Sequence, residues 1–432
     1  MILTKYKLRE ILDVTRGASL SGEYYATEGE YIRLTCGNFD YQNNCFKENK
    51  SKDNLYYVGD FKSEFLMEEG DIITPLTEQA IGLLGSTAII PESGKYIQSQ
   101  DVAKIICKKD LLDKDFAFYL ISSALVKQQL SAAAQQTKIR HTSPDKIKDC
   151  TVWIPELAEQ KRIGKLLRSI DRKIELNRAI NQNLEAMAKQ LYDYWFVQFD
   201  FPNEEGKPYK SSGGEMVWNE KLKRNMPKEW CAMTIGEVEN NIITGKTPSC
   251  ADEDNFGGDI PFITIDDIRG NLFVFNSQRT LSTKGAESQT KKYLPSGSLS
   301  VSCIGTIGVM GFIAKLSQTN QQINSIVFEN EHNREFVYFA LKLYFENAKA
   351  KTGNVFANMS KDEFASIKVV YSPKQILQEF HNKVVAIFDN IKNNIDEINA
   401  LTKQRDELLP LLMNGQAMVN SDLSTLFNPL CC

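Results

Sequence analysis

The stretch Ile163-Gly-Lys-Leu-Leu167-Arg-Ser-Ile170-Asp-Arg-Lys-Ile174-Glu-Leu-Asn177 places its apolar residues in alternating steps of four and three. This is the a/d spacing of a coiled coil, and here it is sustained over about five heptads. The seam residues are Ile163, Leu167, Ile170, Ile174, Asn177, Asn181, Leu184, Ala188, Leu191 and Trp195. The spacing predicts a long helix with one apolar stripe that must pack against a partner.

The same spacing returns near the end of the chain, with Phe380 in the place of Ile163, a shift of 217 positions. The second seam consists of Phe380, Val384, Ile387, Ile391, Asn394, Ile398, Leu401, Arg405, Leu408 and Leu412. Because neither stripe has another apolar partner of this kind in the chain, we predict that the two helices pair antiparallel as a coiled coil. The residues expected at their interface are Ile163, Leu167, Ile170, Ile174, Asn177, Leu184, Leu191, Phe380, Val384, Ile387, Ile391, Asn394, Leu401 and Leu408.

An asparagine occupies the same step of both seams, Asn177 in the first helix and Asn394 in the second. A buried asparagine in such a seam lowers stability but fixes the register of the two helices. The alternative places both amides at the solvated edge of the seam. The sequence leaves the two interpretations open.

A segment of mixed strands and turns precedes each helix, and the two segments share one order of elements. The expected elements are strands at 31–34, 71–74 and 102–106 and a helix at 116–130, and then strands at 262–265, 298–301 and 324–327 and a helix at 336–345. The turns Gly82-Leu-Leu-Gly85 and Gly308-Val-Met-Gly311 are expected to correspond. This predicts an α+β fold: two mixed α/β domains separated by a pair of long antiparallel helices, with a pseudo-two-fold internal repeat.

The predicted boundaries follow the two copies of this pattern. They are a first domain at 1–155, its helix at 156–197, a linker rich in proline, glycine and serine at 198–228, a second domain at 229–372, its helix at 373–416 and a tail at 417–432.

Composition narrows the class of protein further. The 432 residues are 42% hydrophobic and 25% charged, which is typical of a globular chain. No stretch is apolar enough for a membrane span, the first residues do not resemble a signal peptide, and the nine cysteines are scattered, as in proteins of a reducing compartment. We therefore expect a cytoplasmic protein without a membrane partner. The net charge of −4 argues weakly against nucleic acid, so basic patches would have to be local.

The sequence contains no recognisable catalytic motif. There is no GxSxG, P-loop or HExxH pattern, and no paired-carboxylate nuclease set. His141, His332 and His381 are far apart in the sequence and no cysteine pair has CxxC spacing, so no metal site is expected. These absences predict a non-catalytic chain.

The geometry of the predicted helices suits a DNA reader. A helix of about 40 residues spans roughly 60 Å, and the B-DNA major groove returns about every 34 Å, so two domains on one rod could meet two half-sites. The loop before the last strand is basic at 136–141 and amide-rich at 352–358. Arginine and lysine suit guanine edges and asparagine suits adenine, although such side chains are equally often plain solvated groups. The candidate DNA-binding residues are Arg16, Lys138, Arg140, His141, Lys246, Arg269, Asn354 and Asn358.

Several segments resemble the helical regions of type I restriction-modification specificity subunits. They are Pro155-Glu-Leu-Ala-Glu-Gln160-Lys-Arg-Ile163, Asn181-Gln-Asn-Leu184-Glu-Ala-Met187-Ala-Lys-Gln-Leu191-Tyr-Asp-Tyr-Trp-Phe196, Val197-Gln-Phe-Asp-Phe201-Pro and Leu408-Leu-Pro-Leu-Leu-Met413-Asn-Gly-Gln416. The likeness covers nearly the whole chain, but the helices carry its specific signal and the domains match mainly in layout.

The resemblance implies that each domain is a target-recognition domain for one half of a bipartite DNA sequence, and that the helices set the gap. It implies three partners: double-stranded DNA, two methyltransferase subunits docked along the helices, and motor-nuclease subunits. It also implies that the chain itself holds no cofactor, while partner subunits use S-adenosylmethionine, Mg and ATP. The main alternative is a non-catalytic coiled-coil adaptor that reads no DNA; a nuclease or methyltransferase in one chain is disfavoured by the absent motifs.

Overall fold

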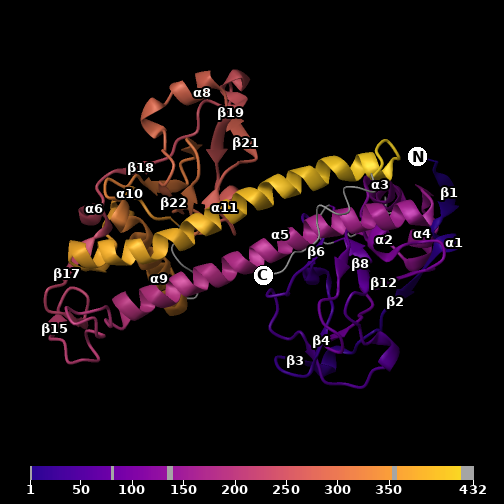
Figure 1. Ribbon diagram of the computed structural model, residues 1–432, viewed down its shortest axis with the longest axis horizontal. Coiled ribbons are helices and arrows are strands. Elements are labelled where there is room, and N and C mark those ends of the chain that lie inside the picture. The colour runs from indigo at the N-terminus through magenta and orange to yellow at the C-terminus, as the bar shows by residue number, and fades with distance from the viewer. Residues whose placement is uncertain (1, 79–81, 134–139, 353–357, 420–432) are drawn as a thin grey trace. The chain divides into compact units, whose positions relative to one another are not determined.

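Figure 1 draws the computed structural model, which describes residues 2–78, 82–133, 140–352 and 358–419. The chain divides into two units, one of Met1–Ile174 with Ala400–Cys432 and the other of Glu175–Asn399. Both dividing points fall inside long helices. The first lies in the middle of α5 (Leu157–Tyr192), and the second lies beyond the middle of α11 (Lys374–Met413). Each unit therefore holds one domain together with parts of both helices.

The first domain is built on two small sheets. The antiparallel sheet has the order β10 (Ala88–Ile89), β8 (Ile72–Pro75), β12 (Val102–Cys107) and β2 (Leu12–Arg16). The second sheet has the order β11 (Tyr96–Ile97), β4 (Tyr31–Arg33), β7 (Tyr56–Tyr57) and β3 (Tyr25–Ala26). All four residues of β8 are buried, as expected of a strand in the middle of a sheet, and the one polar side chain, Thr74, donates to the Ser86 carbonyl at 2.8 Å.

Helices α2 (Lys114–Ile121) and α3 (Ala124–Ala133) pack on this domain where the sequence predicted one helix. The break falls at Ser122, whose hydroxyl donates hydrogen bonds to the carbonyls of Phe118 and Tyr119. Serine side chains compete with backbone donors in this way, so the helix ends there. The last strand, β14 (Thr151–Ile154), returns to pair antiparallel with β1 (Thr4–Lys7) before α5 begins.

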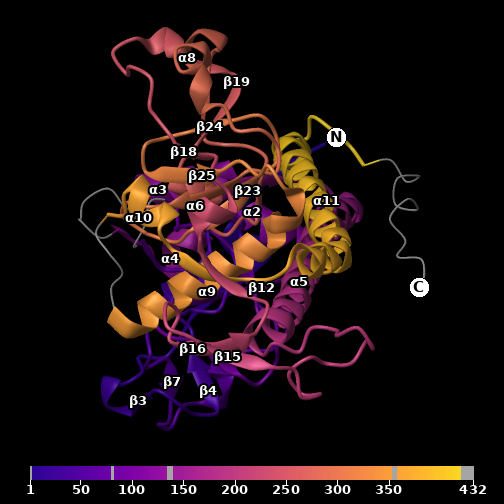
Figure 2. The same ribbon diagram turned by 90° about the vertical axis from the view of Figure 1, so that its left-hand side faces the viewer.

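The second domain repeats this arrangement, and Figure 2 shows part of its main sheet. The order is β18 (Ile242–Thr244), β25 (Ile323–Ile326), β22 (Leu299–Ser302), β23 (Met310–Ile313) and β20 (Phe273–Val274). The first four strands correspond to β2, β12, β8 and β10 in the same order. Helix α9 (Arg334–Thr352) takes the place of α2 and α3, and β17 (Cys231–Thr234) pairs with β26 (Lys368–Tyr371) as β1 pairs with β14. The predicted internal repeat is thus present in the topology.

The second domain also has a second small sheet, and its central strand, β19 (Phe256–Ile263), is longer than the corresponding strand β4 of the first domain. Strand β19 pairs antiparallel with β21 (Arg279–Leu281) and parallel with β24 (Gln318–Thr319). The predicted strand at 262–265 stops at Ile263, because Thr264 begins the short helix α7 (Ile265–Ile268) and its hydroxyl donates to Asp267 at 2.7 Å. Such a capping box satisfies the free backbone donors of a helix start.

Helices α5 and α11 run antiparallel, as predicted. In the second unit, Asn177 meets Glu397 and Asn181 meets Asn394. Just beyond α5, in the π-helical turn η4 (Asp193–Val197), the ring of Trp195 lies 5.9 Å from Phe380. In the first unit, Ile163 and Leu167 share a core with Leu412, Met413 and the domain's own helix α2. Ascending numbers on one helix meet descending numbers on the other, which is the signature of antiparallel pairing. All fourteen predicted interface residues are buried or half-buried.

The two seam asparagines do not meet each other. Asn177 is only 2% exposed, and its amide donates to the Glu397 carboxylate at 2.7 Å. Asn394 is half-buried and donates to the Asn181 side-chain oxygen at 2.8 Å. Both therefore form polar contacts between the helices, which supports the register-fixing interpretation over the solvated one for Asn177.

The segment predicted as a linker is folded onto the second unit. It contains a hairpin of β15 (Met216–Asn219) and β16 (Arg224–Pro227), and Phe201 stacks on Trp230 with ring centroids 5.0 Å apart. The aromatic end of the first helix, Trp195 and Phe196, is buried in the same core. Proline and glycine predicted turns correctly, but the aromatic side chains between them attach the segment to the core. Among the described residues, no helix has the length and apolarity that a bilayer crossing requires.

A buried ion pair replaces an apolar contact in the seam of the first unit. Arg405 donates to the Asp171 carboxylate at 2.9 Å, and the two side chains are 10% and 11% exposed. The Tyr119 hydroxyl from α2 donates to the other carboxylate oxygen at 2.5 Å. Burial, and next the charge of Asp171, raise the pKa of Tyr119 well above its ordinary value, so this hydroxyl remains a donor. Asp171 thus joins both helices to the domain.

Replacing Arg405 with leucine should lower the free energy of unfolding by about 3–5 kcal/mol, because Asp171 would become an unpaired buried charge. Urea unfolding of the full chain, followed by circular dichroism, measures this loss. The control is Lys403→Leu, an exposed position on the same helix, which should change stability by about 0.5 kcal/mol or less. Adding Asp171→Leu to Arg405→Leu should restore most of the stability. A single variant as stable as the wild type would contradict the assignment.

Candidate nucleic-acid interface

Loops of the first domain converge beside the end of β2, held by three backbone hydrogen bonds. The Ala18 N–H donates to the Gln98 carbonyl at 2.9 Å, and the Leu76 N–H donates to the Asp101 carbonyl at 2.8 Å. The Thr142 N–H donates to the Leu76 carbonyl at 2.9 Å. These bonds bring together the end of β2, the turn before β12, the end of β8 and the chain that returns after α3.

The same three bonds recur in the second domain. The donors are Lys246, Cys303 and Met359, and the acceptors are the carbonyls of Thr319, Gln322 and Cys303, at 2.9, 2.8 and 2.8 Å. Lys246 thus corresponds to Ala18, Cys303 to Leu76 and Met359 to Thr142. We call these two places the matched edges. They consist of residues 16–18, 76–78, 98–101 and 140–142 in the first domain and 244–246, 303–306, 319–322 and 358–359 in the second.

Three predicted DNA-binding residues, Arg16, Arg140 and His141, lie on the matched edge of the first domain. Arg16 is exposed and its Nε donates to the Gln100 carbonyl at 2.9 Å. His141 is exposed, and its Nδ1 lies 3.3 Å from the Thr77 hydroxyl. Arg140 is opposite Glu78 in the ladder of β13 (Arg140–His141) and β9 (Thr77–Glu78), while Lys138 lies outside the described residues. The three backbone hydrogen bonds of this edge thus bring Arg16 and His141 to one region.

Three predicted residues gather in the second domain. Lys246 and Asn358 are exposed on the matched edge, and Asn358 forms a β-bridge with Ile304. Arg269 is exposed and donates to the Thr306 hydroxyl at 3.5 Å, with the Asp266 carboxylate 3.8 Å away. Asn354 lies outside the described residues. By correspondence of the edges, Asn358 stands where the first domain has His141.

Thr306 and the hairpin loop that carries it were not among the residues predicted from the sequence. A signal for this loop was present but misaligned: Gly82 and Gly85 correspond to Gly305 and Gly308, not to Gly308 and Gly311. Gly82, Gly85, Gly305 and Gly308 have φ between 77° and 93°, whereas Gly311 lies within strand β23. A left-handed conformation favours glycine, so the pair of glycines three residues apart marks the same turn in both domains.

A second surface feature lies on α5 within the second unit. Leu176, Ile180 and Met187 are between 38% and 58% exposed. Their steps of four and seven place them on one face of the helix, which differs from the seam face. We call these residues the α5 stripe. Large apolar side chains in a row on a helix surface are typical of a protein interface.

The two domains share one strand order and one set of loop hydrogen bonds, and each is connected to one of the paired helices. This arrangement defines an internally duplicated protein with two equivalent candidate binding surfaces. The family model described as "Type I restriction modification DNA specificity domain" matches residues 3–186 and 227–406, each with one domain and most of its helix. The chain therefore belongs to this family and carries its domain twice. This confirms the resemblance found in the sequence and identifies the chain as a type I specificity subunit.

Similar proteins agree with this assignment. The type I restriction enzyme HindI specificity subunit of Haemophilus influenzae is 30% identical over 374 residues, covering 74% of this chain and 81% of that protein. The MjaIX specificity subunit of Methanocaldococcus jannaschii is 22% identical, covering 73% and 71%. The crystal structure of the S subunit of a type I system from M. genitalium has the same fold, with a TM-score of 0.60 over 96% of both chains at 17% identity.

Proposed function

We propose that each domain reads one half of a bipartite DNA sequence with its matched edge. One observation carries this proposal: the same three backbone hydrogen bonds build both edges, while the side chains displayed there differ. His141 is replaced by Asn358 and Ala18 by Lys246. Bases are distinguished by their donor and acceptor patterns, so two different half-sites require two different sets of side chains. The two edges present such different sets on the same backbone arrangement.

The exposed side chains have chemistry that suits base edges and phosphates. Asparagine pairs with adenine through two hydrogen bonds, and arginine pairs in the same way with guanine. Asn358 and Arg269 supply these groups around the loop at 303–306, and Lys246 supplies a phosphate contact beside them. The coiled-coil adaptor is not favoured, because a scaffold has no use for two exposed polar edges built alike.

We further propose that the helix pair sets the gap between the half-sites. Helix α11 has 40 residues, or about 60 Å, and contributes residues to both units. Polar contacts at defined steps, such as Asn177 with Glu397 and Asp171 with Arg405, oppose sliding of one helix along the other. A pair that cannot slide gives one preferred gap.

The α5 stripe is our proposed docking surface for a methyltransferase subunit, because it is apolar and lies outside the seam. In this proposal the chain is non-catalytic and works in the cytoplasm. S-adenosylmethionine, Mg and ATP are used by the methyltransferase and motor-nuclease partners. The chain's net charge of −4 fits this division, since partner subunits would supply much of the phosphate contact.

Replacing Asn358 with alanine should weaken binding to the bipartite site about tenfold and relax the preference at one half-site only. The measurement is a competition titration with DNA changed in one half at a time, using the chain purified with its methyltransferase subunit. Asn240→Ala, an exposed asparagine of the same domain away from the matched edge, is the control and should bind as the wild type. An equal loss for every sequence, with a shallower salt dependence, would show a phosphate contact and contradict base reading.

Deleting residues 173–179 together with 396–402 should shorten the preferred gap by about three base pairs. Seven residues preserve the a/d phase of both helices and remove about 10 Å of rise. The contacts of Asp171 with Arg405 and of Asn181 with Asn394 are retained. Binding is measured on DNA with a series of gap lengths. Deletion of 173–179 alone misaligns the seam and should abolish binding to every gap; an unchanged gap in the double deletion would disprove the ruler.

Replacing Met187 with glutamate should weaken association with the methyltransferase subunit tenfold or more, because a charge would be placed in an apolar contact. Sedimentation of the mixed subunits measures the affinity, and circular dichroism checks that the helices remain folded. Gln182→Glu, an exposed change on another face of α5, adds the same charge and should leave association unchanged. Equal affinities for the two variants would exclude the α5 stripe as the docking surface.

A further inference from the structure

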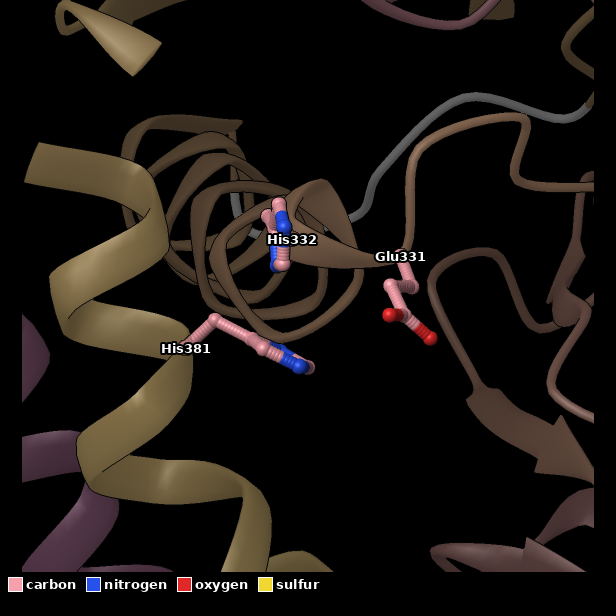
Figure 3. A group of neighbouring side chains, drawn as sticks. All are labelled: Glu331, His332 and His381. Carbon is pink, nitrogen blue, oxygen red and sulfur yellow. The ribbon is translucent and has the colours of Figure 1, made fainter. Parts of the chain in front are cut away.

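Three potential metal ligands converge in the second unit, although they are distant in the sequence. Glu331 and His332 lie in the short turn η7 (Glu331–Asn333) before α9, and His381 comes from α11 (Figure 3). One ligand atom from each lies within 4.8 Å of the others, and the two imidazole centroids are 5.0 Å apart. The wide sequence separation that argued against a metal site therefore does not apply to His332 and His381.

The imidazole of His381 is held in place by a buried carboxylate. His381 is 6% exposed, and its Nδ1 lies 2.6 Å from Oε2 of Glu335, which is completely buried. The other Glu335 oxygen accepts a hydrogen bond from Arg334 at 2.9 Å. A carboxylate that engages one imidazole nitrogen orients the ring and makes the other nitrogen, Nε2, a better metal ligand.

His332 contributes a buried ring nitrogen. Its Nδ1 is inaccessible to solvent and has no hydrogen-bond partner within the part of the chain that the structure describes. An unsatisfied buried nitrogen is costly, and a bound cation would remove that cost by accepting the lone pair. Glu331 is exposed and adds an anionic oxygen at the mouth of the cluster, where water has access.

The shared fold does not require these residues. His381 corresponds to Gly164 in the first helix, by the same shift of 217 positions that relates the two seams. A Cβ at Gly164 would lie 2.7 Å from the Phe116 backbone nitrogen and 2.8 Å from the Asp113 carboxylate, so a side chain has no room there. In the first domain, α5 packs at Gly164 directly against the backbone at the start of α2. In the second domain, the equivalent position of α11 carries His381, which contacts the buried Glu335.

We propose that Glu331, His332 and His381 bind one divalent transition-metal ion of the zinc type. Two imidazoles and one carboxylate form a common zinc ligand set, and a water molecule completes four ligands. Since the ligands come from η7 and from α11, the ion attaches the second domain to the helix of the seam. Metal bound only by the folded chain adds its binding free energy to stability.

The first test is thermal unfolding of the metal-free full chain with and without ZnCl2. At a hundredfold excess over Kd, zinc should raise the unfolding temperature by about 5 °C. His332→Ala and Glu331→Gln should lose most of this rise, while Glu329→Gln, an exposed glutamate outside the cluster, should retain it. His381 is left intact because its loss would leave Glu335 unpaired. The same rise in His332→Ala would assign the zinc to other groups, such as the exposed Cys231 and Cys250, and overturn the proposal.

The second test gives a signal that a merely structural role for His332 cannot produce. One equivalent of Co²⁺ should bind the wild-type chain with visible d–d absorption. The variant His332→Cys should keep stoichiometric binding and gain a thiolate-to-cobalt charge-transfer band, because cysteine sulfur is itself a ligand for such ions. Absence of stoichiometric Co²⁺ and Zn²⁺ binding by the wild type, or of the new band in the variant, would overturn the proposal. Neither test needs DNA or a partner subunit.

Discussion

The antiparallel seam of α5 and α11 is the constraint on which the rest of the molecule depends. An apolar stripe alone would permit several registers, because neighbouring heptads are alike. Here polar residues are set into the stripe and each must find a partner: Asn177 with Glu397, Asn394 with Asn181, and Asp171 with Arg405. A shift of one heptad would leave these groups buried and unpaired, at a cost of several kcal/mol. Register is therefore specified by the polar exceptions to the apolar pattern.

The matched edges show how one fold can carry two specificities. The three backbone hydrogen bonds that join the loops do not depend on side-chain identity, so Ala18 and Lys246, or Thr142 and Met359, occupy equivalent places. Side chains are then free to change without loss of the frame. This separation of a constant backbone from a variable surface is the physical basis for reading different half-sites with duplicated domains.

The two domains have diverged where the shared frame permits it. The second has an added edge strand, β20, and a longer β19 whose bend at Phe256–Ile260 carries an irregular register. It also has His381, Glu335 and His332 where the first domain packs a glycine of α5 directly against α2. Duplication thus preserved topology and hydrogen bonding, while the contacts between each domain and its helix were remade with different chemistry.

The sequence by itself determined the two long helices, their pairing, the repeat and the family, because a 3.5-residue period is local information that a single helix already contains. It also predicted the strands β4, β8, β12, β19, β22 and β25. It predicted neither the break at Ser122, where a side chain competes with the backbone, nor the end of β19 before Thr264. Only the tertiary structure decided that Leu76 joins Asp101 to Thr142, that Arg405 meets Asp171, and that His332 faces His381. These contacts depend on the order of strands in the sheet and on the register of the helices, and no periodicity within one segment contains either.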